Sequence, residues 1–145
     1  MKPRAAWPIL AKKAKEKCNE ATVAVVKGRE RITHLRQSIE RMEMLHADYV
    51  ARSLESEKNI MTMSEAMNFR GFLQQIRTLI SRVEIDLDHA KQELEIKKNA
   101  LQVAEKKRIQ METLLEQDLK RVQKAERKRE QGEMDATGVM LFNTK

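Results

Sequence analysis

Two long stretches of this chain place apolar or small residues at alternating intervals of three and four, which is the spacing of a heptad repeat. The repeat covers residues 18–42 and returns over 69–125. In the first stretch its positions hold Cys18, Ala21, Val25, Gly28, Ile32, Leu35, Ile39 and Met42. Such a stripe leaves water only by packing against another helix. Because one aperiodic polar stretch separates the two repeats, the sequence predicts an all-α fold, a long antiparallel two-helix coiled-coil hairpin.

Prolines, glycines and capping residues predict where the elements begin and end. Pro8 suits a first helical turn, Ser64 is a candidate N-cap, and Gly132 and Gly138 end the heptad pattern. Residues 1–145 are expected to form a single coiled-coil domain. The expected elements are a first helix over about 7–55, a turn over about 56–63, a second helix over about 64–131 and a flexible tail over 132–145.

The position of the turn decides which residues face each other across the seam, by which we mean the apolar interface between the two helices. With the reversal near Lys58–Asn59, residues whose numbers sum to about 120 should pair. The expected pairs are Tyr49 with Phe72, Leu35 with Val83 or Leu87, and Gly28 with Leu94. A glycine inside a helix costs roughly 1 kcal/mol relative to alanine, and on the seam Gly28 would allow close approach of the second helix. Charged residues that would set the register occupy seam positions Lys97, Arg108 and Asp118.

The composition indicates a thin apolar interface between helices whose side chains are mostly exposed to solvent. Charged residues make up 35% of the chain and aromatic residues 3%, which is the bias of long helices. The formal net charge is +7, and the basic segments 2–31 and 97–130 share the end of the hairpin that carries both termini. This charge permits a nucleic acid, an anionic lipid or an acidic protein as partner and selects none of them. The single cysteine, Cys18, lies on the apolar stripe and is expected to be a small buried side chain.

The chain offers no arrangement of residues typical of an enzyme. His34, His46 and His89 lack a cysteine or histidine partner at metal-ligand spacing, and no phosphate loop or nucleophile elbow is present. We therefore expect no catalytic residues, no metal and no cofactor. No apolar stretch approaches the ~20 residues of a membrane helix, and Trp7–Ala11 is too short for the core of a signal peptide. A soluble cytoplasmic protein is expected.

Three interpretations of the surface remain open. The residues beside the predicted turn, which include the only tyrosine, could be a well-packed end of the seam or an apolar docking surface. The basic runs 106–108 and 124–129 could bind nucleic acid, although they contain no aromatic residue for base stacking. A generic scaffold that pairs with copies of itself is the third interpretation. The apolar group beside the turn consists of Met42, Leu45, Tyr49, Phe69, Phe72 and Ile76.

Three segments of the chain carry short motifs in a definite order, namely Leu10–Ala14 with Ala21, Asn68–Ile76 and Glu126–Asp135. Together they resemble the FliJ family of flagellar type III export proteins. The run Asn68–Ile76 resembles the family segment N-[YF]-x-x-F-[IL]-x-x-[LI], and Glu126–Asp135 is similar to the closing run of the family. The opening Leu10–Ala14 with Ala21 also fits, as does Tyr49 before the turn. The resemblance spans essentially the whole chain.

The resemblance implies a non-enzymatic stalk of two antiparallel helices. In such a stalk the end with both termini binds a hexameric FliI-like export ATPase, and the half near the turn binds the FlhA-like export gate. Family members also handle empty export chaperones, so the protein would lie at the cytoplasmic face of the membrane export gate, with no nucleic-acid partner. A stalk of a related injectisome is the nearest alternative. The implied gate-binding residues are Met42, Leu45, Tyr49, Phe72, Ile76, Leu79 and Val83. Basic candidates for ATPase binding at the terminal end are Lys13, Lys17, Arg121, Lys124, Arg127 and Lys128.

Overall fold

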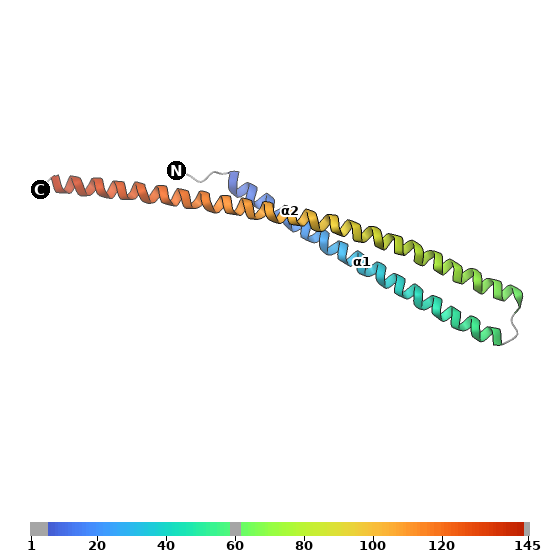
Figure 1. The fold of residues 1–145 in the computed structure, drawn as a ribbon. Helices are drawn as coiled ribbons and strands as arrows, with labels where there is room; N and C mark the ends of the chain where they lie inside the picture. The colour runs from blue at the N-terminus through green and yellow to red at the C-terminus, as the bar shows by residue number, and fades with distance from the viewer. Residues whose placement is uncertain (1–5, 59–61, 144–145) are drawn as a thin grey trace. The chain divides into compact units, whose positions relative to one another are not determined.

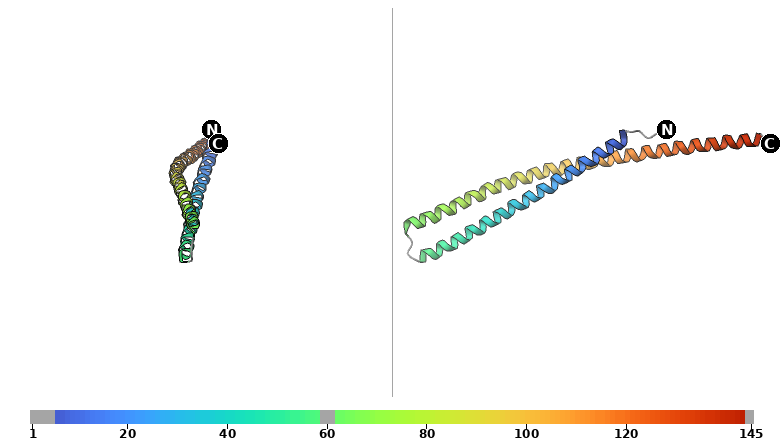
Figure 2. Two further views of the ribbon diagram at one scale, coloured as in Figure 1. Left: turned by 90° about the vertical axis from the view of Figure 1, so that its right-hand side faces the viewer. Right: turned by 180° about the vertical axis from the view of Figure 1, so that it is seen from behind.

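The computed structural model describes residues 6–58 and 62–143, and these residues contain two α-helices (Figure 1). Helix α1 covers Ala6–Lys58 and helix α2 covers Met63–Asn143. The described residues include no strand. The two helices pack against each other in opposite directions, as Figure 2 shows from two further sides. The predicted all-α, two-helix coiled-coil hairpin is therefore confirmed.

The beginnings of both helices follow simple rules. Helix α1 begins at Ala6, one residue before the expected start, and Pro8 lies in its first turn, where a missing N–H costs nothing. Helix α2 is capped by Thr62 and not by Ser64, because Thr62 Oγ1 accepts a hydrogen bond from the backbone N–H of Glu65 at 3.2 Å. Thr62 and Glu65 have the spacing of a capping box. Of the predicted reversal, Lys58 is the last residue of α1, and Asn59 lies outside the described residues.

The end of α2 differs from the expectation. The helix continues through Gly132 and Gly138 to Asn143, whereas the sequence placed its end near residue 131 and a flexible tail beyond. Glycine stops a helix efficiently when it adopts a positive φ as a C-cap, and no glycine among the described residues does so. Each glycine therefore costs only about 1 kcal/mol of helix propensity, which does not end a helix that is already formed.

Contacts divide the chain into two compact units, and unit 2 comprises Thr22–Asn99. Its α1 and α2 segments meet in the predicted register. A Cβ added to Gly28 would lie 3.2 Å from Leu94 Cδ1, and the rings of Tyr49 and Phe72 lie 4.4 Å apart. Ion pairs that cross the seam join Arg31 to Glu93 at 3.8 Å and Arg77 to Glu43 at 3.0 Å. The buried side chains of this unit include Val25, Ile32, Ile76, Ile80, Ala90 and Leu94.

Unit 1 comprises Met1–Ala21 and Ala100–Lys145, of which the structure describes residues 6–21 and 100–143. Its core is a cluster of Ala11, Ala14 and Met111, and Trp7 packs against this cluster. Cys18 is buried, as the sequence predicted. The small side chains of α1 let the longer side chains of α2 fill the seam, in keeping with knobs-into-holes packing.

The charged residues on the seam of unit 1 are paired. Asp118 is 5% exposed and forms an ion pair with Arg121 on the next turn of α2. Arg108 lies 3.2 Å from Glu112, and the hydrogen bond to Glu112, with a smaller contribution from Cys18, raises the pKa of the Arg108 guanidinium above its usual value. A buried carboxylate is tolerated only with such partners.

Candidate partner-binding surfaces

The aromatic side chains of unit 2 form one patch at the start of α2. This aromatic patch consists of Tyr49 from α1 with Phe69 and Phe72 from α2. The Tyr49 ring lies 4.4 Å from the Phe72 ring at 44° and 6.3 Å from the Phe69 ring at 59°. These tilted contacts are favourable for aromatic rings. The Cζ atom of Arg52 lies 5.6 Å from the Tyr49 ring centre, at cation–π distance.

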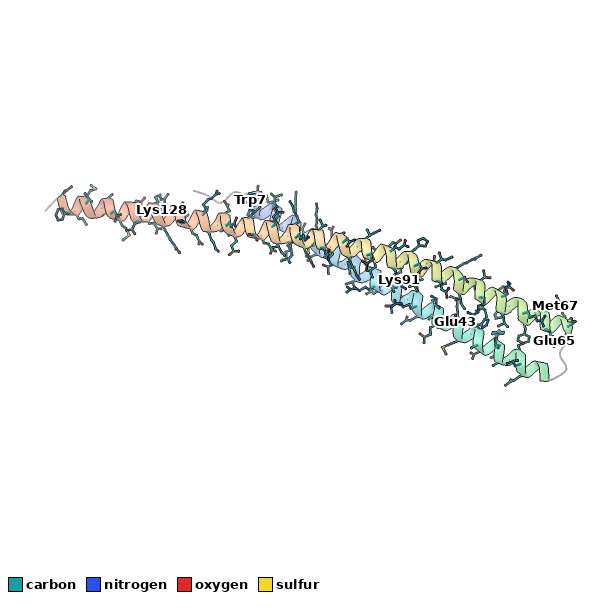
Figure 3. All side chains as sticks on the ribbon, viewed as in Figure 1. Trp7, Glu43, Glu65, Met67, Lys91 and Lys128 are labelled. Atoms are coloured by element: carbon teal, nitrogen blue, oxygen red, sulfur yellow. The ribbon has the colours of Figure 1, made fainter. Side chains whose placement is uncertain are left out.

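The aromatic patch is accessible from outside the hairpin. Phe72 is 37% exposed, and Tyr49 and Phe69 are half-buried. Together with Glu65 and Asn68, the three rings line a hollow of ≈ 370 Å³. Glu65 and Met67 lie in the first two turns of α2 (Figure 3), and Met67 is 65% exposed. An apolar hollow with polar groups at its rim suits the docking of an apolar side chain of a partner.

The seven residues predicted to bind the gate all lie in unit 2 but differ in accessibility. Leu45, Phe72 and Leu79 are exposed, whereas Ile76 is 3% exposed and lies in the seam. Ile76 is therefore not accessible to a partner in the isolated chain and contributes to the packing beneath the exposed residues. Met42, Tyr49 and Val83 are half-buried. The structure brings Tyr49 and Phe72 into direct contact.

The six basic candidates all belong to unit 1 and are exposed, but they do not form one cluster. Lys13 and Lys17 lie on the stretch of α1 whose Ala14 packs against Met111. Lys128, labelled in Figure 3, lies 17 residues beyond Met111 on α2, which is about 25 Å along the helix. Arg121 is partly engaged by its ion pair with Asp118. The remaining candidates, Lys124 and Arg127, lie on α2 between Arg121 and Lys128. The basic candidates are thus spread along both helices.

Two apolar features of unit 1 were not singled out from the sequence. Trp7 lines a hollow of ≈ 280 Å³ together with residues of α2 that include Leu114 and Arg121. Near the end of α2, Met134 and Leu141 line a groove of ≈ 560 Å³, and Phe142 is 80% exposed. Met134 and Leu141 are seven residues apart, a spacing that indicates a shared helix face. The sequence analysis did not use this spacing, because it expected a flexible tail over residues 132–145.

Comparison with known proteins identifies a family for this chain. The family model described as Flagellar FliJ protein matches residues 9–145. No curated protein and no solved structure was found to match. Among the described residues, no helix has the length and apolar character needed to cross a membrane.

Proposed function

Because the chain belongs to the flagellar FliJ protein family, we propose that it is a stalk-like adaptor that joins the export ATPase to the export gate. Membership of this family supports a role in flagellar protein export, and in our proposal that role is non-enzymatic. In our proposal unit 1 binds the hexameric FliI-like ATPase, and the aromatic patch of unit 2 binds the FlhA-like gate. The protein would promote assembly and coupling of the ATPase and the cycling of export chaperones, and it would work in the cytoplasm.

The accessible aromatic patch is the observation that carries the proposal. A patch that served only the seam would bury its rings, whereas Phe72 keeps 37% of its surface exposed beside a hollow of ≈ 370 Å³. Tyr49 holds the Phe72 ring at 4.4 Å and thereby fixes its orientation before a partner arrives. An aromatic side chain that is held in place before binding loses little conformational entropy on binding, which is typical of binding hot spots.

The exposed cations of unit 1 support the ATPase part of the proposal. Arg127 and Lys128 lie on a part of α2 where every residue from 126 to 143 is exposed. A helix with exposed basic groups can enter an acidic or polar pore without losing packing of its own. Both helices continue without a break from unit 1 into unit 2, so a displacement at the ATPase end has a continuous helical path toward the gate-binding residues.

The test compares two variants against both partners. Phe72→Ala should weaken binding to the export-gate protein by about 2 kcal/mol, or ~30-fold, because an anchoring ring is removed. It should leave stimulation of the export ATPase at the level of the parent chain. The double variant Arg127→Glu/Lys128→Glu should do the reverse, with reduced ATPase stimulation and unchanged gate affinity. Calorimetry and the ATP hydrolysis rate are the two measurements.

Phe142→Ala is the matched control, because it removes an exposed phenylalanine outside the aromatic patch. It should not affect gate binding. Circular dichroism of each variant checks that the helices persist. If the parent chain neither binds nor stimulates the ATPase, the stalk role is wrong. If Phe72→Ala binds the gate as tightly as the parent does, the aromatic patch is not the gate-binding site.

A further inference from the structure

A second groove in unit 2 carries cationic side chains from both helices. Its volume is ≈ 450 Å³, and buried Ile32 and Leu94 form its floor. It lies apart from the aromatic patch, because Arg36 precedes Tyr49 by 13 residues, or about 20 Å along α1. We call it the cationic groove and define it by Arg29 and Arg36 of α1 and Lys91 and Lys98 of α2.

The cations of the groove exceed its acids. One carboxylate, Glu95, lines it, and this group lies 3.4 Å from Lys98 Nζ. Within residues 6–58 and 62–143, no ion pair engages the guanidinium groups of Arg29 and Arg36 or the ammonium group of Lys91. Three positive charges are therefore available to a ligand in the groove.

The cations form two rows with the repeat of a helix. Arg29 and Arg36 are seven residues apart on α1, and Lys91 (labelled in Figure 3) and Lys98 are seven apart on α2. Seven residues correspond to two helical turns, or about 10.5 Å. A third helix lying in the groove would present flanking side chains at this same interval. Acidic residues at heptad spacing on both of its flanks would meet both rows, as e and g positions do in coiled coils.

We propose that the cationic groove binds an acidic amphipathic helix of a partner protein, separately from the ATPase and the gate. A nucleic acid is less well matched, because no aromatic residue lines the groove for base stacking, and one strand of phosphates follows one path whereas the cations form two rows. An anionic membrane is flat and would reach the outer ends of the cations without filling the groove.

The test uses the full chain and synthetic peptides. The probe is a peptide of three heptads with a leucine stripe flanked on both sides by glutamates. The control peptide has the same composition, with its glutamates moved to the opposite face. The parent chain should bind the probe at least about ten-fold more tightly than the control, and Arg36→Glu/Lys91→Glu should lose about ten-fold in affinity for the probe.

The matched control variant is Lys27→Glu/Arg82→Glu, which makes the same charge change at exposed positions of unit 2 outside the groove. It should retain the parent affinity for the probe. The neutral variant Arg36→Gln/Lys91→Gln should show an intermediate loss, and circular dichroism checks the fold of each. Equal affinity of the two charge-reversal variants would overturn the proposal. So would a loss that affects poly(U) RNA or phosphatidylglycerol vesicles but spares the peptide.

Discussion

At the scale of single residues, Gly28 and Gly71 show how the same residue type can have opposite roles in a helix. Both lie inside helices, and neither has a positive φ. A Cβ on Gly28 would meet Leu94 Cδ1 at 3.2 Å, whereas a Cβ on Gly71 would meet nothing within 4 Å. Gly28 therefore lies in close contact with the neighbouring helix, whereas Gly71 faces open space and only weakens its own helix.

We predict that the same substitution will change stability in opposite directions at these two positions. Gly28→Leu should lower the free energy of unfolding by about 2 kcal/mol, because the new side chain overfills the seam at Leu94. Gly71→Leu should raise it by about 0.8 kcal/mol through helix propensity. Urea unfolding followed by circular dichroism measures both. A similar loss at both positions would show that the contrast in packing is not what matters.

Residue identity predicted some of these details and not others. The pairing of Gly28 with Leu94 followed from the heptad repeat and the place of the turn. The N-cap of α2 could not be predicted in this way. Thr62 and Glu65 have capping-box spacing, but Ser64 is an equally good N-cap by residue type. Which of two neighbouring hydroxyls caps a helix depends on where the backbone becomes helical.

At the scale of elements, the last part of α2 is helical although its side chains are exposed to solvent. Every residue from 126 to 143 is exposed, so its stability comes from propagation out of the packed part of the helix. This explains why the sequence placed the end too early. The heptad pattern reports packing, and Ala125 is the last described residue that is not exposed, but helix propagation requires no packing.

We predict that Gly132→Ala will stabilise this segment without changing the global stability. The substitution should favour the helix by about 1 kcal/mol. Amide hydrogens of residues 133–136 should then exchange about five-fold more slowly. The urea midpoint of the whole chain should stay the same, because the side chains of these residues are exposed and this end of the helix can fray without unfolding the packed part. A shifted midpoint would show that the segment packs against another part of the chain.

At the scale of the whole molecule, the candidate surfaces were only partly foreseeable. The heptad repeat and the family resemblance together located Tyr49 and Phe72 at one level of the hairpin. They could not tell that Ile76 is buried while Leu79 is exposed, because adjacent seam positions differ in how far each side chain turns toward the partner helix. The cationic groove could not be predicted from the sequence either, because it depends on the register of the two helices. Its cations are 55 or more residues apart in sequence between α1 and α2, and only the register aligns them.

We propose that the two units unfold together as a single domain. No linker divides them, because α1 continues across residues 21 and 22 and α2 across residues 99 and 100. Breaking a continuous helix in the middle would expose unpaired backbone groups at two new ends. Partial unfolding of one unit is therefore penalised, and the transition should be cooperative.

Trp7 provides the probe for this last prediction, since it is the only tryptophan and packs against the core of unit 1. Ile80→Ala removes a buried side chain of unit 2 and should cost about 3 kcal/mol. If the chain is one domain, this distant substitution lowers the urea midpoint of Trp7 fluorescence as much as that of circular dichroism. Met111→Ala, beside Trp7 in unit 1, should shift both signals together as well. If Ile80→Ala leaves the urea midpoint of Trp7 fluorescence unchanged, the units unfold independently and the continuity of the helices does not couple them.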